Sequence, residues 1–306
     1  MTKILVASQA DQPHTAALVT VYLPTRNRSA LVGRAIDSVL AQSYPRIELI
    51  VVDDCSKDDT ADVVRRCMAG NDTGKSFEYV RLDAPSGPAV ARNEAIRRAT
   101  GHLVTGLDDD DYFLPDRIAR LVAAFDPAAC SFVFDGYLRE TLLSGGRVRR
   151  TPIPLSRVVP LRDLLKRNIV GNQVLTLTSR LRDIDGFDPR LPAWEDYDLW
   201  IRLVRRFGDA RPAGGLSYVH TVDGTRPRLS DDTAKASRAY DIFLEKHPEY
   251  GEADLQLCLR LAKTCFGIDA LSLSDVPKLL RLGEPRYVLF AFYSYLAQRW
   301  SRKRSR

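Results

Sequence analysis

Residues 18–125 alternate between short runs rich in β-branched residues and longer stretches with helical spacing of apolar residues. The β-branched runs predict strands over residues 18–24, 47–54, 77–82 and 102–111. The stretches between them predict helices over residues 30–43, 60–70 and 88–101. Strands that alternate with helices on this scale are typical of a mostly parallel sheet with helices on both faces. The sequence therefore predicts an α/β fold.

Polar residues follow three of these strands where each one ends. They occur at Pro24–Asn27, at Asp53–Asp54 and at Asp108–Asp111. Ligands of open α/β sheets bind outside the carboxyl ends of the strands. The sequence therefore predicts that these three segments meet in one binding site.

The rest of the chain is patterned differently. Residues 130–140 and 145–153 predict a hairpin around Gly145 and Gly146. Further segments predict a helix over 161–168, a strand over 172–179, a helix over 195–208, a strand over 216–222 and helices through 231–304. We therefore expect an N-terminal extension (1–17), one domain (18–225, with halves 18–125 and 126–225) and a helical C-terminal extension (226–306).

The composition is that of an ordinary globular chain, but its charge is uneven. The 306 residues are 45% hydrophobic and 27% charged, with a formal net charge of +6 that is concentrated partly in the final "QRWSRKRSR". A basic tail suggests nucleic acid or an anionic membrane as partner, although a solvated terminus explains it equally well. The five cysteines include no C-x-x-C pair, so neither a disulfide framework nor a zinc ribbon is indicated.

No segment predicts a membrane span. The first residues lack a convincing signal peptide, and the longest apolar run, residues 287–297, is about half the length that crosses a bilayer. We expect a cytoplasmic protein, either soluble or peripheral on the membrane. The segment 287–306 could lie on an anionic leaflet, or it could be a buried docking helix or a dimer contact.

The stretch "GLDDDDYFLP" at 106–115 carries the strongest chemical signal. A carboxylate cluster after a buried strand suits a hard divalent cation, which takes oxygen ligands. The alternative is a solvated acidic turn. Its position at the ligand edge of the predicted sheet favours the cation site.

Two other stretches favour a nucleotide. In "VVDDCSKDDT", Asp53 or Asp54 could accept hydrogen bonds from a ribose or a base, while Asp58 or Ser56 could cap the next helix. In "PSGPAVARN", a glycine turn leads into a helix that carries Arg92, and both features favour anions.

The stretch "WEDYDLW" at 194–200 places acids between tryptophans. A carboxylate in partly apolar surroundings can act as a general base, and Trp194 could stack on a sugar. The alternative is that Glu195 and Asp196 only favour a helix N-terminus. His220 is at the end of a predicted strand. It could be a structural histidine, or it could contact a metal or a phosphate.

Together these residues resemble the inverting family 2 glycosyltransferases, which have the GT-A fold. The resemblance runs from about Leu18 to His220. It rests on five motifs in the family's order: "VTVYLPTRNR", "IELIVVDDCSKDDT", "GPAVARNEAIRRATG", "LDDDDYFLPDRI" and "GFDPRLPAWEDYDLWIRL". A nucleotidyltransferase would instead begin with a glycine-rich loop, and the first loop here has no glycine before Gly33.

The resemblance implies a role for each motif. The nucleotide pocket would be formed by Pro24, Thr25, Asn27, Asp54 or Asp53, Arg92 and Asp108. The family's metal motif is L-D-x-D-D-x-x-x-P, so Leu107 and Pro115 set the register and Asp109 fills the variable position. Asp110 would bind Mn²⁺ or Mg²⁺, with Asp108 toward the ribose or the metal and His220 near the metal and diphosphate. Strand alternation would place Asp108 and Asp110 on one side.

The remaining roles concern transfer. The resemblance implies that Asp196 is the catalytic base, with Trp194 and Glu195 on the acceptor side. The substrates would be a nucleotide-diphosphate sugar and a hydroxyl of a glycan or lipid-linked acceptor, in cell-surface polysaccharide or lipopolysaccharide synthesis, with no nucleic-acid partner. Gln298–Trp300 does not match the motif of the processive synthases, so we expect transfer of one or a few sugars. A non-catalytic nucleotide-sugar-binding protein of the same fold is the alternative.

Overall fold

The computed structural model describes residues 17–143, 146–171, 173–223, 233–265 and 276–281. Its first half is a five-stranded sheet in the order β3-β2-β1-β4-β8. Four of its strands are parallel: β1 (Val19–Thr25), β2 (Ile47–Asp53), β3 (Ser76–Arg81) and β4 (Leu103–Gly106). The predicted α/β class and the first three predicted strands are confirmed, whereas the fourth, predicted over 102–111, ends at Gly106.

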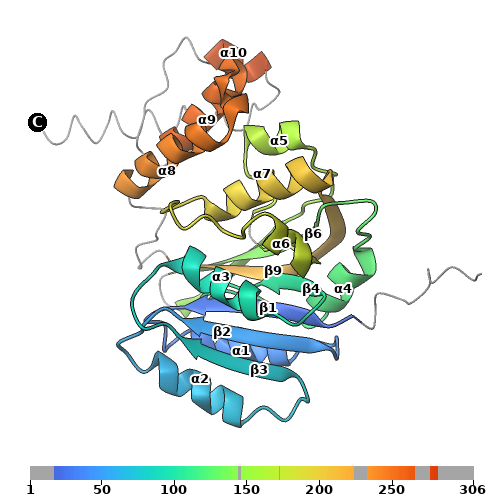
Figure 1. Cartoon of the computed structure of the whole chain (residues 1–306), viewed down its shortest axis with the longest axis vertical. Coiled ribbons are helices and arrows are strands. Elements are labelled where there is room, and N and C mark those ends of the chain that lie inside the picture. The colour runs from blue at the N-terminus through green and yellow to red at the C-terminus, as the bar shows by residue number, and fades with distance from the viewer. Residues whose placement is uncertain (1–16, 144–145, 172, 224–232, 266–275, 282–306) are drawn as a thin grey trace, which may run out of the picture.

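Helices cover both faces of this sheet (Figure 1). On one face lie α1 (Val32–Leu40), α2 (Thr60–Ala69) and α4 (Arg117–Ala124), and their apolar residues share a core with Val21 and Leu49. On the other face lies α3 (Pro88–Arg98), which packs with Tyr22 and Ile50. The alternation of apolar residues along β1 and β2 therefore supplies both cores.

The strand β8 (Thr176–Leu177) is much shorter than the predicted strand over 172–179. Leu175 bridges instead to Val133 of the second sheet, and only two residues pair antiparallel with β4. The helix α6 (Thr178–Asp183) starts directly afterwards, where the Thr178 hydroxyl donates to the Gly101 carbonyl at 2.6 Å. The prediction was wrong because the segment divides its backbone hydrogen bonds between two sheets.

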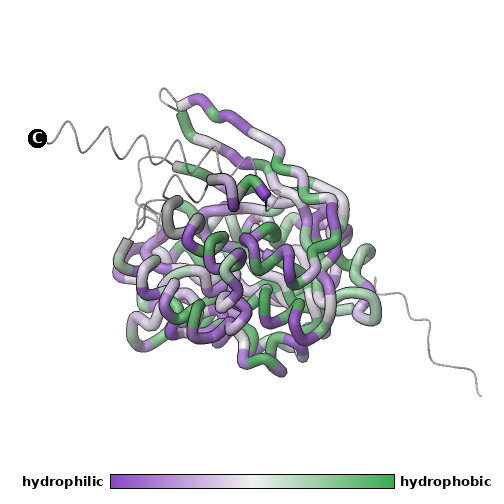
Figure 2. The backbone as a smooth tube through the Cα atoms, turned by 90° about the horizontal axis from the view of Figure 1, so that it is seen from above, coloured by the Kyte–Doolittle hydropathy of each residue, from purple (hydrophilic) through white to green (hydrophobic). Residues whose placement is uncertain are grey.

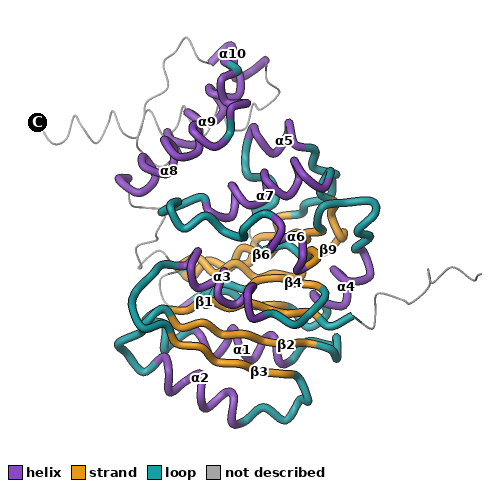
Figure 3. The backbone as a smooth tube through the Cα atoms, in the orientation of Figure 1, coloured by secondary structure: helices purple, strands orange, loops and turns teal. Residues whose placement is uncertain are grey.

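The second sheet has the order β5-β9-β6-β7. It contains β5 (Tyr112–Phe113), β6 (Val133–Leu142), β7 (Val148–Ile153) and β9 (Arg211–Asp223). The predicted hairpin is confirmed as the antiparallel pair β6–β7. The strand β9 pairs parallel with β6 along most of its length. Figure 3 shows these two long strands, β6 and β9, side by side.

The remaining helices form the upper layer in Figure 1. They are α5 (Leu161–Lys166), α7 (Glu195–Phe207), α8 (Thr233–Lys246), the 3₁₀ turn Pro248–Gly251, α9 (Ala253–Cys265) and α10 (Val276–Arg281). Phe243 of α8 and Tyr250 belong to the same core as Trp200 of α7. This part of the helical extension therefore packs on the preceding domain. The predicted tail helix over 287–306 lies outside the described residues.

None of the helices in the described ranges has the length and hydrophobicity that crossing a membrane requires. Along the backbone, hydrophobic and hydrophilic residues alternate closely (Figure 2), in agreement with strands and helices that each bury one face.

Candidate active site

A cavity of about 750 Å³ lies where the carboxyl ends of β1, β2 and β4 meet. Pro24 and Thr25, Asp54, and Asp108–Asp111 all line it. The second half of the chain contributes Gly171, Gln173, Trp194–Asp196 and His220. The predicted convergence of the three polar segments is therefore confirmed, because parallel strands bring their carboxyl ends to one edge of the sheet.

The two acids that end β2 take different positions. The Asp53 carboxylate is fully buried and accepts hydrogen bonds from the Ser56 backbone N–H at 2.8 Å and the Tyr79 hydroxyl at 2.9 Å. Asp54 lines the cavity and accepts the backbone N–H groups of Ser86, at 2.6 Å, and Gly87, at 3.0 Å. Of the two alternatives for the nucleotide contact, only Asp54 faces the cavity.

Asn27 stands just outside the cavity lining. Its backbone has a left-handed φ of 52°, its N–H donates to the Ser56 hydroxyl at 2.9 Å, and its side-chain oxygen accepts the Lys57 N–H at 2.8 Å. Asn27 therefore joins the loop after β1 to the loop after β2. Asn27 is not among the residues that line the cavity, and its contact with a nucleotide stays a prediction.

The four aspartates lie in a turn and not in a strand. The strand β4 ends at Gly106, and the Asp111 N–H donates to the Asp108 carbonyl at 3.1 Å. A side chain at Gly106 has no room, because a Cβ atom there would lie 2.2 Å from the Tyr22 ring. Strand alternation therefore does not apply to Asp108 and Asp110, although both line the cavity.

The four carboxylates have different partners. Asp108 accepts the Arg92 guanidinium at 2.9 Å, and Asp109 lies 3.6 Å from that of Arg28. Asp111 is buried and accepts the Tyr218 hydroxyl and the Thr221 N–H, both at 2.8 Å. Asp111 is therefore tied to β9, while Asp108, Asp109 and Asp110 are the more exposed members of the group.

Negative charge is crowded in this turn. Burial, together with the charges of Asp110 and Asp108, raises the pKa of Asp109 to about 7 against the opposing effects of the Thr25 hydroxyl and Arg28. The pKa of Asp111 is also raised well above its ordinary value by burial and by the same two neighbours. The turn therefore has a deficit of positive charge that a bound cation would offset.

Arg92 is the shared counter-ion of the cavity. It is buried on α3, and its guanidinium contacts Asp108 at 2.9 Å and Glu195 at 2.7 Å. Burial alone would lower its pKa, but the two carboxylates raise the pKa, so the side chain stays charged. Its Nε has no hydrogen-bond partner within the described residues. Arg92 therefore links the aspartate turn to the start of α7.

Asp196 lies in the first turn of α7 and lines the same cavity as the aspartate turn. Its carboxylate accepts the Tyr197 N–H at 2.7 Å and the Asn168 side-chain amide at 3.4 Å. Burial and then the charge of Glu195 raise its pKa to about 7, against the opposing effects of the Tyr197 N–H and Arg92. A carboxyl group with this pKa can accept a proton near neutral pH.

Trp194 precedes α7 with a left-handed φ of 64° and lines the cavity. Its ring packs edge-to-face on Phe243 of α8, with the ring centroids 5.4 Å apart. His220 of β9 also lines the cavity, and its ring contacts that of Tyr137 at 5.9 Å. Both residues therefore lie where the sequence-based hypotheses require.

A buried ionic cluster joins α7 to the end of α8. The Asp198 carboxylate contacts Arg202 at 2.7 Å, Lys246 at 2.9 Å and His247 at 3.0 Å. Arg205 can only donate to the other ring nitrogen of His247, at 3.0 Å, so His247 donates its Nε2 proton to Asp198. This cluster holds the helix that carries Asp196 against α8.

Several cavity residues were not identified from the sequence. Gln173 donates to Asp108 at 3.3 Å and accepts the Tyr22 hydroxyl at 2.8 Å. Arg34 donates to the Asp110 carbonyl at 2.6 Å. Gln173 follows no pattern in the sequence, whereas Arg34 is one helical turn into α1 and could have been considered with the polar loop that precedes it.

The fold is of the GT-A type. Two solved structures have this fold: a mannosyltransferase of Pyrobaculum calidifontis in complex with GDP-Man and Mn²⁺, and residues 1–349 of Staphylococcus aureus TarS in complex with UDP-GlcNAc. The first has a TM-score of 0.58 and 20% sequence identity, and the match covers 95% of this chain and 91% of the mannosyltransferase chain. The second has a TM-score of 0.55 and 18% identity, with coverages of 93% and 92%. At these identities the likeness shows the fold alone.

The chain belongs to glycosyl transferase family 2, whose family model matches residues 20–180. It is 33% identical over 237 residues to WcaA of Escherichia coli, named for a glycosyl transferase of colanic acid biosynthesis, covering 76% of this chain and 82% of the relative. It is 30% identical over 189 residues to TuaG of Bacillus subtilis, named for teichuronic acid biosynthesis, covering 62% and 73%. The protein is therefore a glycosyltransferase, as the five motifs predicted.

Proposed function

We propose that this protein is a metal-dependent, inverting glycosyltransferase of cell-surface polysaccharide synthesis. It would move a sugar from a nucleotide-diphosphate sugar to a hydroxyl of a glycan or lipid-linked acceptor. The observation that carries the proposal is that one cavity is lined both by a crowded aspartate turn and by Asp196, whose pKa is raised to about 7. The names of the relatives support a role in polysaccharide synthesis.

A divalent metal fits the aspartate turn by its chemistry. Within the described residues, no group of three or more His, Cys, Asp or Glu side chains gathers closely enough to chelate an ion. Mg²⁺ is commonly held by only one or two carboxylates together with substrate phosphates and water, and all these ligands are oxygen. Asp110 and Asp108 would supply the carboxylates, with His220 nearby. A bound Mn²⁺ or Mg²⁺ would neutralise the charge of the diphosphate leaving group.

The donor would occupy the side of the cavity formed by the strand ends. Asp54 lies at the end of β2, where a carboxylate can accept hydrogen bonds from a base or ribose. Pro24 and Thr25 form the adjacent wall, and Arg92 supplies a buried positive charge. These contacts would orient the sugar toward α7.

Asp196 would act as the general base. Its raised pKa lets it take a proton from the acceptor hydroxyl while that oxygen attacks the anomeric carbon from the face opposite the diphosphate. A single displacement of this kind inverts the anomeric configuration. Trp194 and Glu195 lie beside Asp196 and would position the acceptor.

The test is a screen of nucleotide sugars for hydrolysis and transfer in the presence of Mn²⁺ or Mg²⁺. Replacing Asp196 by Asn should reduce transfer by about a hundredfold or more while nucleotide binding persists. Asp62→Asn on α2, where the side chain is 63% exposed, is the matched control and should keep full activity. Full activity of Asp196→Asn would contradict the base assignment. Nucleotide-sugar binding without any turnover of the unchanged protein would favour the non-catalytic alternative.

A further inference from the structure

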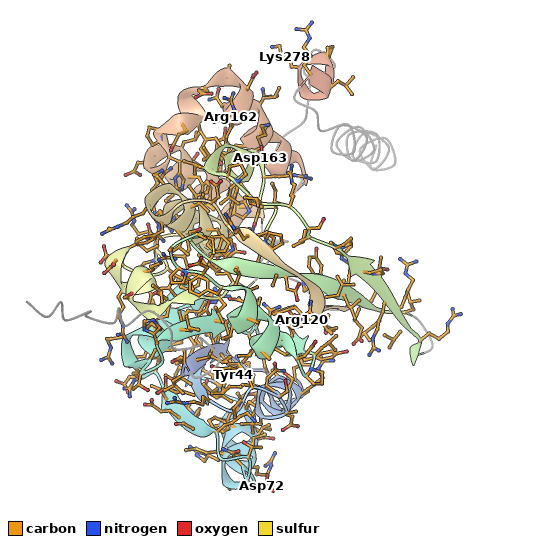
Figure 4. All side chains as sticks on the ribbon, turned by 90° about the vertical axis from the view of Figure 1, so that its right-hand side faces the viewer. Tyr44, Asp72, Arg120, Arg162, Asp163 and Lys278 are labelled. Carbon is orange, nitrogen blue, oxygen red and sulfur yellow. The ribbon has the colours of Figure 1, made fainter. Side chains whose placement is uncertain are left out.

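The hairpin of β6 and β7, described over residues 133–143 and 146–153, extends from the body of the protein as an arm. In Figure 4 its green strands reach far to the right, and Figure 2 shows it projecting at the top. The base is fixed, because the buried Asp135 accepts the Ser217 hydroxyl at 2.6 Å and lies 3.6 Å from Arg120. The strand β9 pairs with β6 out to Leu142. The arm is therefore held in one direction.

The exposed charges on this arm are all positive. Arg139, Arg147 and Arg149 are exposed, and none of them forms an ion pair within the described residues. The two acids of the arm are buried, Asp135 at 2% and Glu140 at 5% exposure. Glu140 is also neutralised by Arg150 at 2.8 Å. Within the part of the chain that the structure describes, the arm therefore presents positive charge that no acid compensates.

The end of the arm is also apolar. Leu142, Leu143 and Val148 are 44%, 39% and 50% exposed, which is unusual for aliphatic residues of a strand pair. Leu142 and Val148 lie directly opposite each other in the β6–β7 register. Exposed aliphatic side chains beside arginines are the features by which a surface segment binds the interface of an anionic bilayer.

We propose that the arm binds the surface of a membrane that contains anionic lipids, with Leu143 and Val148 entering the headgroup region and the arginines contacting lipid phosphates. A soluble anionic polymer would account for the arginines, but it would leave the aliphatic residues in water. Lipid binding accounts for both. The proposal goes beyond the transfer reaction and does not depend on it.

Membrane binding through the arm would orient the cavity. Two residues of the arm, Tyr137 and Leu142 of β6, also line the cavity. The cavity therefore opens next to the proposed membrane contact, where an acceptor sugar attached to a lipid would be presented. Figure 4 shows that α2, which ends shortly before the labelled Asp72, lies at a different end of the molecule.

The test is sedimentation of the full chain with vesicles of phosphatidylcholine and phosphatidylglycerol, compared with phosphatidylcholine alone, without nucleotide. The double variant Arg147→Gln/Arg149→Gln should bind about 30-fold more weakly, since each arginine near an anionic surface contributes about fivefold. Leu143→Ser/Val148→Ser should weaken binding several-fold. Arg65→Gln/Arg66→Gln on α2 removes the same charge elsewhere and should bind as the unchanged protein does.

Three results would overturn the proposal. The unchanged protein could fail to bind anionic vesicles, or the arm variants could bind as well as it does, which would place binding elsewhere in the chain. If only the arginine variant were weakened, and dextran sulfate bound with equal dependence on these arginines, the arm would be a site for soluble polyanions. Circular dichroism and donor hydrolysis of each variant test folding and the proposed function separately, because Arg147, Arg149 and Val148 do not line the cavity.

Discussion

Asp196 and Asp198 lie two residues apart on α7, and replacing each by asparagine should change stability in opposite directions. Asp196 is held in the cavity wall with a pKa raised from 3.8 to about 7 by burial and by Glu195. Burial acts on Asp198 too, but the His247 hydrogen bond and the charges of Arg202 and Lys246 outweigh it and lower the pKa to about 2. The folded protein therefore resists ionisation of the first carboxyl and favours it for the second.

The size of the Asp196 effect follows from its pKa. A rise of about three units corresponds to about 4 kcal/mol at pH values where the group is ionised in both states. Cavity water reaches part of this side chain, so we expect Asp196→Asn to raise the free energy of unfolding by about 2 kcal/mol at about pH 8. In the unchanged protein, the destabilisation caused by the buried Asp196 carboxyl begins as the pH rises through 3.8 and is complete above about 7. The gain should therefore largely disappear at about pH 4.5.

Asp198→Asn should have the opposite result. It leaves the buried cations of the cluster without their shared carboxylate, and breaking a buried ion pair in this way costs about 3 kcal/mol or more. The contribution of the lowered pKa is present above 3.8 and is lost only as the pH falls through about 2. The deficit of this variant should therefore persist at about pH 4.5, where the gain of Asp196→Asn has faded.

Urea denaturation of the metal-free and nucleotide-free protein at both pH values measures these free energies, with tryptophan fluorescence as the signal. An Asp196→Asn variant that is no more stable than the unchanged protein at about pH 8, or equally stabilised at both pH values, would refute the reasoning about the cavity carboxyl. An Asp198→Asn variant of unchanged stability would refute the role given to the cluster. The two outcomes are independent, since the variants act on different partners.

Further outcomes follow from the same geometry. The value of kcat/KM should rise about tenfold per pH unit below about pH 7 and level off above it, since Asp196 must be ionised to accept a proton; a flat profile in buffers of constant ionic strength would contradict this. Among the aspartates, Asp110→Ala should reduce Mn²⁺-dependent transfer by about a hundredfold or more and Asp109→Ala should reduce it least, and equal losses would shift the metal assignment. Gly106→Ala should lower the free energy of unfolding by about 2 kcal/mol, because the new Cβ would meet the Tyr22 ring at 2.2 Å; urea denaturation measures this, and no loss would show that the strand shifts to make room.

The parallel half of the fold was predictable because its strands are continuous apolar runs. Residues of β1 and β2 are buried on both sides, which is the pattern of strands covered by helices on both faces. This alternation does not decide between Asp53 and Asp54. Asp53 has the parity of Leu49 and Val51 and Asp54 that of Ile50 and Val52, and both pairs lie in a core, so the choice depends on contacts made in the folded chain.

Other parts of the site depend on contacts that no local pattern encodes. The strand β8 was misjudged because its backbone is divided between two sheets, and Gln173 just before it reaches Asp108 only in the folded chain. The expectation that Asp108 and Asp110 share one side rested on strand alternation, which stops at Gly106 where β4 ends. In each case tertiary packing overrides a local preference.

The contact between Trp194 and Phe243 has a consequence for how relatives of this protein can diverge. The cavity wall at Trp194 rests on a side chain of α8, which lies outside the segment matched by the family model and contributes nothing to the cavity lining. A substitution at Phe243 can therefore tilt Trp194 and reshape the pocket without altering any residue that a substrate touches. Acceptor preference can change through drift in the C-terminal helices while the motifs of the catalytic domain stay constant.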